Sequence, residues 1–224
     1  MTDHAHTRPA ERTHSLFSRL RSNRRGVAMI ETAITMPTLI FAGLAGLEVA
    51  NLMITHTRVS GIALTVADNA SRMAPSAGVL ALPRVRESDI NDVFTGAQLQ
   101  SANLNIQANG RVIMSSLESN VEGGQWIHWQ RCYGNKPYSS SFGGEGTGVT
   151  GNSFQGMGAT GRQIRATPGA PVMFVEVYYD YTPFMFDSWI GQRTINYTAA
   201  FVARDSRDTS VLSNPSPAAP VRNC

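Results

Sequence analysis

The sequence is poor in the residues from which metal and nucleophilic sites are built. Its 224 residues include two cysteines and five histidines, and these do not cluster with metal-ligand spacing. His128 is four residues from Cys132 in a run that favours a strand, so the two side chains are expected to lie more than about 10 Å apart. We therefore expect no metal, no cofactor and no enzyme activity.

Concentrated positive charge is absent from most of the chain. The net charge is +3, but residues 1–26 hold six arginines against two acidic residues, which leaves −1 for the remainder. Without a basic patch to neutralise phosphates, nucleic-acid binding by the main domain is not expected. The arginines instead favour a leader, residues 1–26, that stays in the cytoplasm while the following segment crosses a membrane.

A long apolar segment begins directly after this leader. Residues 27–54 contain two ionisable side chains, Glu31 and Glu48, and about 20 apolar residues suffice to cross a bilayer. The apolar pattern continues at spacings of three and four until Pro75 disfavours further helix. We expect one helix of roughly 70 Å, with its membrane part at 27–54 and a periplasmic part at 55–74. The stripe that would face a domain consists of Val59, Ile62, Ala63, Val66 and Ala70.

Glu31 is the residue of this segment with the clearest functional interpretation. A carboxylate near the start of a lipid-embedded helix is costly unless a positive charge compensates it. Cleavage between Gly26 and Val27 would create such a charge, the free amino group of an adjacent helix. The alternative is a first-turn glutamate that is stabilised by the helix dipole and has no further role. Pro37 removes a backbone hydrogen bond and is expected to kink or loosen the membrane part.

The rest of the chain predicts an α+β domain at residues 76–212. A short helix is expected at 88–98, and Asn109-Gly110 is a strong signal for a tight hairpin. The polar tract 133–167 predicts a flexible surface loop, and 213–224 predicts an extended Pro-rich tail. The sheet is expected to be mainly antiparallel, with one covered and one partly wet face. Its strands are expected at 104–108, 112–117, 126–132, 171–181 and 194–203.

The two cysteines lie in the part of the chain expected outside the inner membrane. In an oxidising compartment a disulfide between Cys132 and Cys224 is favoured, and it would tie down the tail. Two unpaired thiols are the alternative.

Residues 24 to about 72 resemble the TadE-like family, which comprises pseudopilin-like minor components of tight-adherence (Tad/Flp) type IV pilus systems. The likeness is carried by the stretch from Arg25 to Pro37, with Gly26 before the expected cut and Glu31 fifth after it. The resemblance implies a pilin-like fold and cleavage by a prepilin peptidase between Gly26 and Val27. It also implies partnership with other pilin-like subunits and Tad inner-membrane assembly proteins.

Thr32 follows the glutamate, where major pilins of these systems usually have tyrosine, and the expected outer domain is larger than theirs. The resemblance therefore implies a minor subunit that supports pilus biogenesis and adhesion, held in the bacterial inner membrane by a single span. The competing hypothesis is a signal-anchored periplasmic binding protein, enzyme or adhesin that keeps residues 1–26. In that case the helix is only a tether.

Overall fold

The computed structural model describes residues 25–73, 84–185, 191–204 and 208–224. Its contacts divide the chain into two units, Met1–Val49 and Ala50–Cys224. The predicted leader, apart from its last two residues, and the predicted helix end at residue 74 lie outside the described residues.

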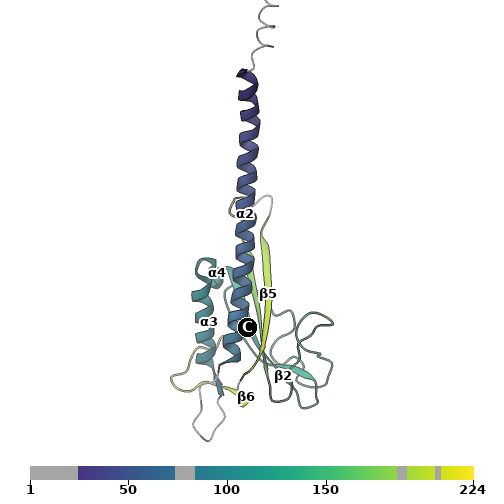
Figure 1. Cartoon of the computed structure of the whole chain (residues 1–224). Coiled ribbons are helices and arrows are strands. Elements are labelled where there is room, and N and C mark those ends of the chain that lie inside the picture. Colours follow the sequence, from purple (N-terminus) through teal and green to yellow (C-terminus); the bar gives the residue numbers. More distant parts are fainter. Residues whose placement is uncertain (1–24, 74–83, 186–190, 205–207) are drawn as a thin grey trace, which may run out of the picture. The chain divides into compact units, whose positions relative to one another are not determined.

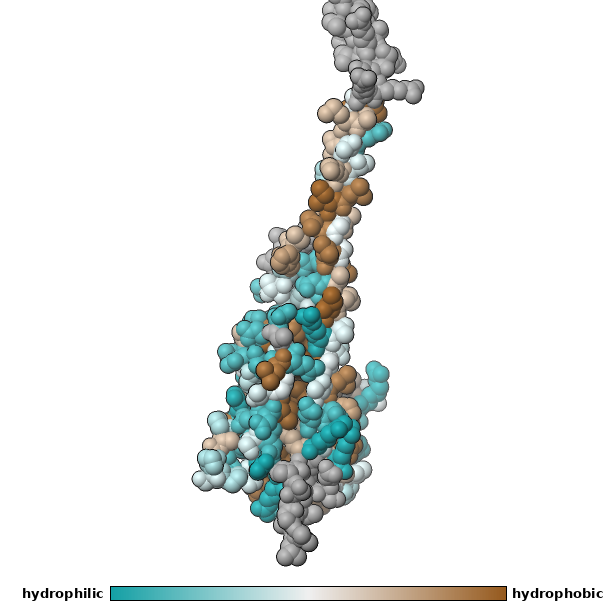
Figure 2. Space-filling model, turned by 60° about the vertical axis from the view of Figure 1, so that its left-hand side comes forward, coloured by the Kyte–Doolittle hydropathy of each residue, from teal (hydrophilic) through white to brown (hydrophobic). Residues whose placement is uncertain are grey.

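The first described element is the helix α2 (Arg25–Ser71), which confirms the prediction of one long N-terminal helix. It is long and apolar enough to cross a membrane. In the first unit its large apolar side chains are exposed, with Met29 at 78% and Leu39 at 71%. Figure 2 shows such side chains along the helix. Exposed apolar surface on this scale is typical of a segment that is covered by lipid or by other helices.

The second unit contains a four-stranded antiparallel sheet with the strand order β3-β2-β4-β5. This confirms the α+β class and the mainly antiparallel sheet. Four of the five predicted strands are present, each within two residues of its expected ends. They are β2 (Gly110–Ser119), β3 (Gln125–Tyr133), β4 (Val172–Tyr181) and β5 (Arg193–Val202).

Two helices cover one face of this sheet: the part of α2 from residue 50 onwards and α3 (Glu87–Ser101) (Figure 1). The predicted stripe on α2 is confirmed, because all five of its residues are at most 1% exposed. Phe94 of α3 is fully buried in the same core and stacks on Tyr133 of β3. Burying a side chain of this size contributes about 1.5–3 kcal/mol, so this layer holds the helices on the sheet.

The expected strand at 104–108 and the expected hairpin after it are wrong. Asn105 adopts a left-handed backbone, with φ of 48°, and its side chain caps a short helix by accepting a hydrogen bond from the Ala108 N–H. Ile106 is thereby turned into the core, where it is fully buried. The Asn109-Gly110 pair ends this helix and begins β2 with Gly110 extended. The helix that Asn105 caps is α4 (Ile106–Asn109), and a second short helix, η1 (Ala102–Leu104), precedes it.

The turn that joins adjacent strands lies instead between β2 and β3. The Asn120 side-chain oxygen accepts hydrogen bonds from the N–H groups of Glu122 and Gly124, at 3.0 and 2.8 Å. A Cβ on Gly124 would lie 2.2 Å from the Gly151 carbonyl, so only glycine fits where the turn meets the long loop. A side-chain oxygen therefore organises this turn, and its sequence lacks the Asn-Gly pair that is typical of a tight hairpin.

The loop 133–167 covers the other face of the sheet over β2, β3 and β4, whereas Thr194, Asn196 and Thr198 of β5 on the same face are exposed, so the expected partly wet face is found on the β5 side. Met157 of this loop is fully buried, and Phe142 and Phe154 pack on the same cluster as Leu117 and Phe174 of the sheet. The loop has few apolar residues and contributes them to the core of the sheet.

The tail, which the sequence predicted to be extended and unpacked as far as Cys224, makes contacts with the domain before that residue. The Asn91 side chain donates a hydrogen bond to the Pro220 carbonyl at 2.8 Å, so the tail is not free before Cys224. A short parallel pair that the sequence did not predict precedes it, formed by β1 (Arg84–Arg86) and β6 (Asp208–Ser213).

Candidate functional site

The residues of the predicted processing and assembly site lie together at the start of α2. Gly26 and Val27 occupy its first turn, and Glu31 lies one turn after Val27 on the same face. All three are exposed, as is Pro37. A second helix that packs against this face would therefore meet the carboxylate of Glu31 and the backbone of Val27 together.

Polar groups on the same stretch of α2 are bonded within the helix. The hydroxyls of Thr32, Thr35 and Thr38 each donate to the backbone carbonyl four residues earlier, at 2.8, 2.7 and 2.9 Å. These bonds make the hydroxyls compatible with an apolar environment. Pro37 has no N–H for the carbonyl of Ala33, yet the helix continues through it. Glu31 thus remains as the ionisable side chain of this exposed apolar stretch.

The predicted disulfide is confirmed: Cys132 of β3 is bonded to Cys224. The Cys132 N–H also donates to the Arg222 carbonyl at 2.8 Å. Arg222 itself donates to the Asn91 side chain at 2.6 Å and lies over the Tyr133 ring. The tail is therefore held by one covalent bond and several polar contacts. The imidazole of His128 is hydrogen-bonded to the Glu118 carboxylate and stacks on Trp126. It is therefore part of the packing around β3.

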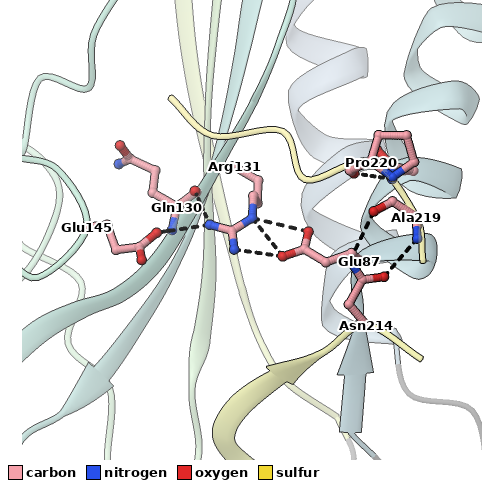
Figure 3. A network of polar contacts seen from close by, with 8 residues as sticks. Glu87, Gln130, Arg131, Glu145, Asn214, Ala219 and Pro220 are labelled. Atoms are coloured by element: carbon pink, nitrogen blue, oxygen red, sulfur yellow. Dashed lines mark hydrogen bonds and ion pairs between the residues drawn. The ribbon is translucent and has the colours of Figure 1, made fainter. Parts of the chain in front are cut away.

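Sequence reasoning did not find the ion pairs of Arg131 (Figure 3). Its guanidinium lies between two carboxylates, Glu87 at the start of α3 and Glu145 in the long loop. The ion pair with Glu87 is bidentate, with N···O distances of 2.7 to 3.2 Å, and the N···O distance to Glu145 is 2.9 Å. One arginine thus joins the helix layer, the sheet and the loop. The available signal was an arginine near the end of the aromatic-rich strand β3.

The ion pair between Arg131 and Glu87 is buried, and burial strengthens its effect on the structure. The side chains of Arg131 and Glu87 are 9% and 4% exposed, whereas Glu145 is 54% exposed. Burial acts to lower the pKa of Arg131, but the hydrogen bonds and charge of Glu87, with those of Glu145, outweigh it and raise that pKa above its ordinary value. Arg131 is therefore a permanent cation held between the two carboxylates.

The same residues close the outer edge of β3. The Gln130 N–H donates to the Glu145 carboxylate at 3.0 Å, and the Gln130 carbonyl accepts from Arg131 at 2.8 Å. On one side of this position Ile127 exchanges two main-chain hydrogen bonds with Gly146 and Thr147 of the loop. On the other side, the Cys132 N–H donates a hydrogen bond to the Arg222 carbonyl of the tail. Side chains, loop and tail therefore take the place of a neighbouring strand.

On the loop-covered face, two carboxylates of β4, the buried Glu176 and the partly exposed Asp180, hold the loop. Glu176 is fully buried and accepts hydrogen bonds from the Ser140 hydroxyl and, at 2.9 Å, from the Ser141 N–H. Asp180 accepts from the Tyr138 hydroxyl and pairs with Lys136 at 2.8 Å. Burial acts to raise the pKa of Asp180, but the hydrogen bonds from Lys136 and Tyr138 outweigh it and lower that pKa. The carboxylate is ionised at neutral pH and holds the base of the loop.

A pocket of about 640 Å³ opens between this loop and the tail. Its lining includes Gln130, Tyr138, Ser139, Glu145 and Asn223. Within the ranges that the structure describes, no three histidine, cysteine or acidic side chains are grouped to hold a metal ion.

The chain was compared with protein-family models, curated proteins and solved structures, and none of them matches.

Proposed function

We propose that the chain is a minor pilin- or pseudopilin-like subunit of a Tad-type pilus assembly and secretion system. The observation that carries the proposal is the combination of Gly26-Val27 with Glu31 at the start of a continuous helix with exposed apolar side chains. In this proposal α2 anchors the protein in the bacterial inner membrane, and the α+β unit lies in the periplasm. The role is structural and mechanical rather than catalytic.

A prepilin peptidase cuts after Gly26 and leaves a positively charged amino group on Val27. Helices of several subunits, from this chain and from other pilin-like proteins, then bundle in the membrane. Glu31 of one helix attracts the amino group of its neighbour, because each charge is costly in lipid without the other. This attraction sets the axial register of neighbouring helices as a subunit is drawn out of the membrane by the inner-membrane assembly proteins.

The proposal is tested by two substitutions on α2 and one control. Glu31→Gln keeps the side-chain size and removes the charge, and Gly26→Ala alters the residue before the cut. Glu31→Gln leaves the Val27 amino group of the neighbouring helix in lipid without its negative partner, which costs a few kcal/mol. We therefore expect this variant to reduce secretion and surface adhesion by roughly 100-fold. Gly26→Ala is expected to reduce both by blocking maturation.

Met29→Leu, at an exposed apolar position of the same turn, is the control and should leave secretion and adhesion unchanged. Protein levels in the membrane fraction are compared for all three variants, so that degradation is separated from failed assembly. Wild-type secretion and adhesion in both Glu31→Gln and Gly26→Ala would remove the proposed role.

A further inference from the structure

The two end strands of the sheet differ in how their outer edges are satisfied. On β3 the outward backbone groups at Ile127, Gln130 and Cys132 bond to the loop, to the Glu145 and Arg131 side chains and to the tail. At the other end of the sheet, β5 has one strand neighbour, β4. An open strand edge binds other extended chains, and natural proteins usually protect such edges. The outer edge of β3 is protected by several contacts, so an outer edge of β5 without such contacts indicates a binding surface.

The pairing with β4 identifies the outward groups of β5. Ala203 donates to the Pro171 carbonyl at 2.8 Å, so odd-numbered residues bond to β4, and the even-numbered residues direct N–H and C=O away from it. Within the described parts of the chain, these even-numbered residues have no main-chain hydrogen bond to another strand or loop. They are Thr194, Asn196, Thr198, Ala200 and Val202.

This edge lacks the features that discourage pairing. Residues 194–202 contain no charged residue and no proline, and the register with β4 runs over ten pairs without a bulge. Thr194, Asn196, Thr198 and Val202 are exposed. On the helix-facing side, Tyr197 and Phe201 are only partly buried and extend the apolar core to the edge. An added strand would gain main-chain hydrogen bonds and apolar contacts together.

The direction of β5 limits what can occupy the edge. Within the second unit, Tyr197 contacts His56 at 3.2 Å, and Arg204 donates to the Ser71 carbonyl at 3.1 Å, so β5 runs in the same direction as α2. Antiparallel pairing of two β5 strands would therefore set their α2 helices in opposite directions. That arrangement is incompatible with copies whose helices enter one membrane from the same side.

Two other pairings between copies are also unfavourable. In parallel pairing, the β5 strands of two copies would be related by a two-fold axis along the strands. Identical residues would then lie side by side but point to opposite faces of the sheet, whereas neighbouring residues in a pleated sheet point to the same face. Pairing of β5 with β3 of another copy would meet the edge that the loop, the ion pair and the tail already cover. Within the part of the chain that the structure describes, these constraints favour a different chain as the occupant over a second copy paired through β5 or β3.

We propose that the outer edge of β5 binds an extended segment of a different subunit in the same membrane assembly, as an added strand. The segment is largely uncharged and places apolar residues beside Tyr197 and Phe201. This inference rests on the proposed function, because the shared membrane orientation is what excludes a second copy.

The test is hydrogen exchange, measured by mass spectrometry on the full chain in native membranes and on the same chain purified in detergent. The inference predicts that the outward amides of β5 exchange roughly 10-fold or more slowly in native membranes than in the purified protein. Amides of odd-numbered β5 residues should be slow in both samples, because they bond to β4. Equal exchange of the outward amides in the two samples would overturn the inference.

Three variants at one position separate backbone pairing from other effects. Thr198→Pro removes an outward N–H and leaves the bonds to β4, Thr198→Lys adds charge to the edge, and Thr198→Val keeps the N–H. The protection in native membranes should be lost in the first two and kept in Thr198→Val. If Thr198→Pro does not fold, judged by its tryptophan fluorescence, Thr198→Lys decides. Protection that survives Thr198→Lys contradicts the inference.

Two further outcomes are distinguishable. Protection that appears in the purified protein as its concentration is raised would show that the occupant is a second copy, which overturns the inference. The N-terminus is determined on the same samples. A cut chain with fast outward amides contradicts the added strand alone, whereas an uncut chain with slow outward amides contradicts the proposed function.

Discussion

Arg131→Met is expected to lower the free energy of unfolding by about 3–5 kcal/mol, because it leaves a buried carboxylate without its partner. Glu87 is 4% exposed and receives three hydrogen bonds from Arg131. The substitution also removes the donor to the Gln130 carbonyl at the edge of β3. Urea unfolding of the full chain in detergent, followed by tryptophan fluorescence, measures the loss, since Trp126 and Trp129 lie in β3.

Two further variants identify the cause of this loss. The double variant Glu87→Met with Arg131→Met buries no charge and should recover most of the stability, since apolar replacement of a buried ion pair is often neutral. Glu145→Gln removes the half-exposed partner and should cost no more than about 1 kcal/mol. If Arg131→Met costs no more than Glu145→Gln, the buried pair with Glu87 is not the contact that joins α3 to the sheet.

Removal of the disulfide is expected to have an effect of similar size. Cys132 and Cys224 are 92 residues apart, and closing a loop of this length typically stabilises a protein by about 2–5 kcal/mol. The double variant Cys132→Ser with Cys224→Ser should therefore melt roughly 5–15 °C below the wild type. Thermal unfolding by circular dichroism gives this shift directly.

The reductant provides the matched comparison for this variant. Reduced wild-type protein should melt close to the double serine variant, and the variant itself should not respond to reductant. A wild-type melting temperature that is unchanged by complete reduction would mean that the polar contacts of Arg222 and Pro220 hold the tail without the covalent bond.

The sequence predicted those parts of the fold in which periodicity and burial coincide. On α2 the stripe from Val59 to Ala70 repeats at three and four residues, and these side chains form the contact with the sheet. β4 is rich in apolar and aromatic residues, and it lies inside the sheet, where both of its faces are buried. Cys132 and Cys224 could be paired because the chain has no other cysteine to compete.

Interactions between distant parts of the chain were not predictable in this way. Asn109-Gly110 suits a tight turn, but the burial of Ile106 and the cap of Asn105 make it the end of a short helix. The loop 133–167 has few apolar residues, and the cover it gives depends on side chains that the sheet supplies. Arg131 meets Glu87, 44 residues earlier in the chain, only once α3 has packed on the sheet.

Of the candidate site, the sequence identified the residues on α2 and the two cysteines. It did not identify the edge of β3, because a charged residue in a strand does not reveal which carboxylate it will meet. Nor did it reveal the contrast between β3 and β5, since strand order in a sheet follows from pairing and not from local pattern.

The most direct test of the proposed function is the N-terminal residue of the protein isolated from native membranes of cells with an active prepilin peptidase, determined by sequencing and intact mass. The proposed maturation predicts a chain that begins at Val27, with Glu31 as its fifth residue. A chain that still carries residues 1–26 in those membranes would contradict it and would leave α2 as a simple anchor.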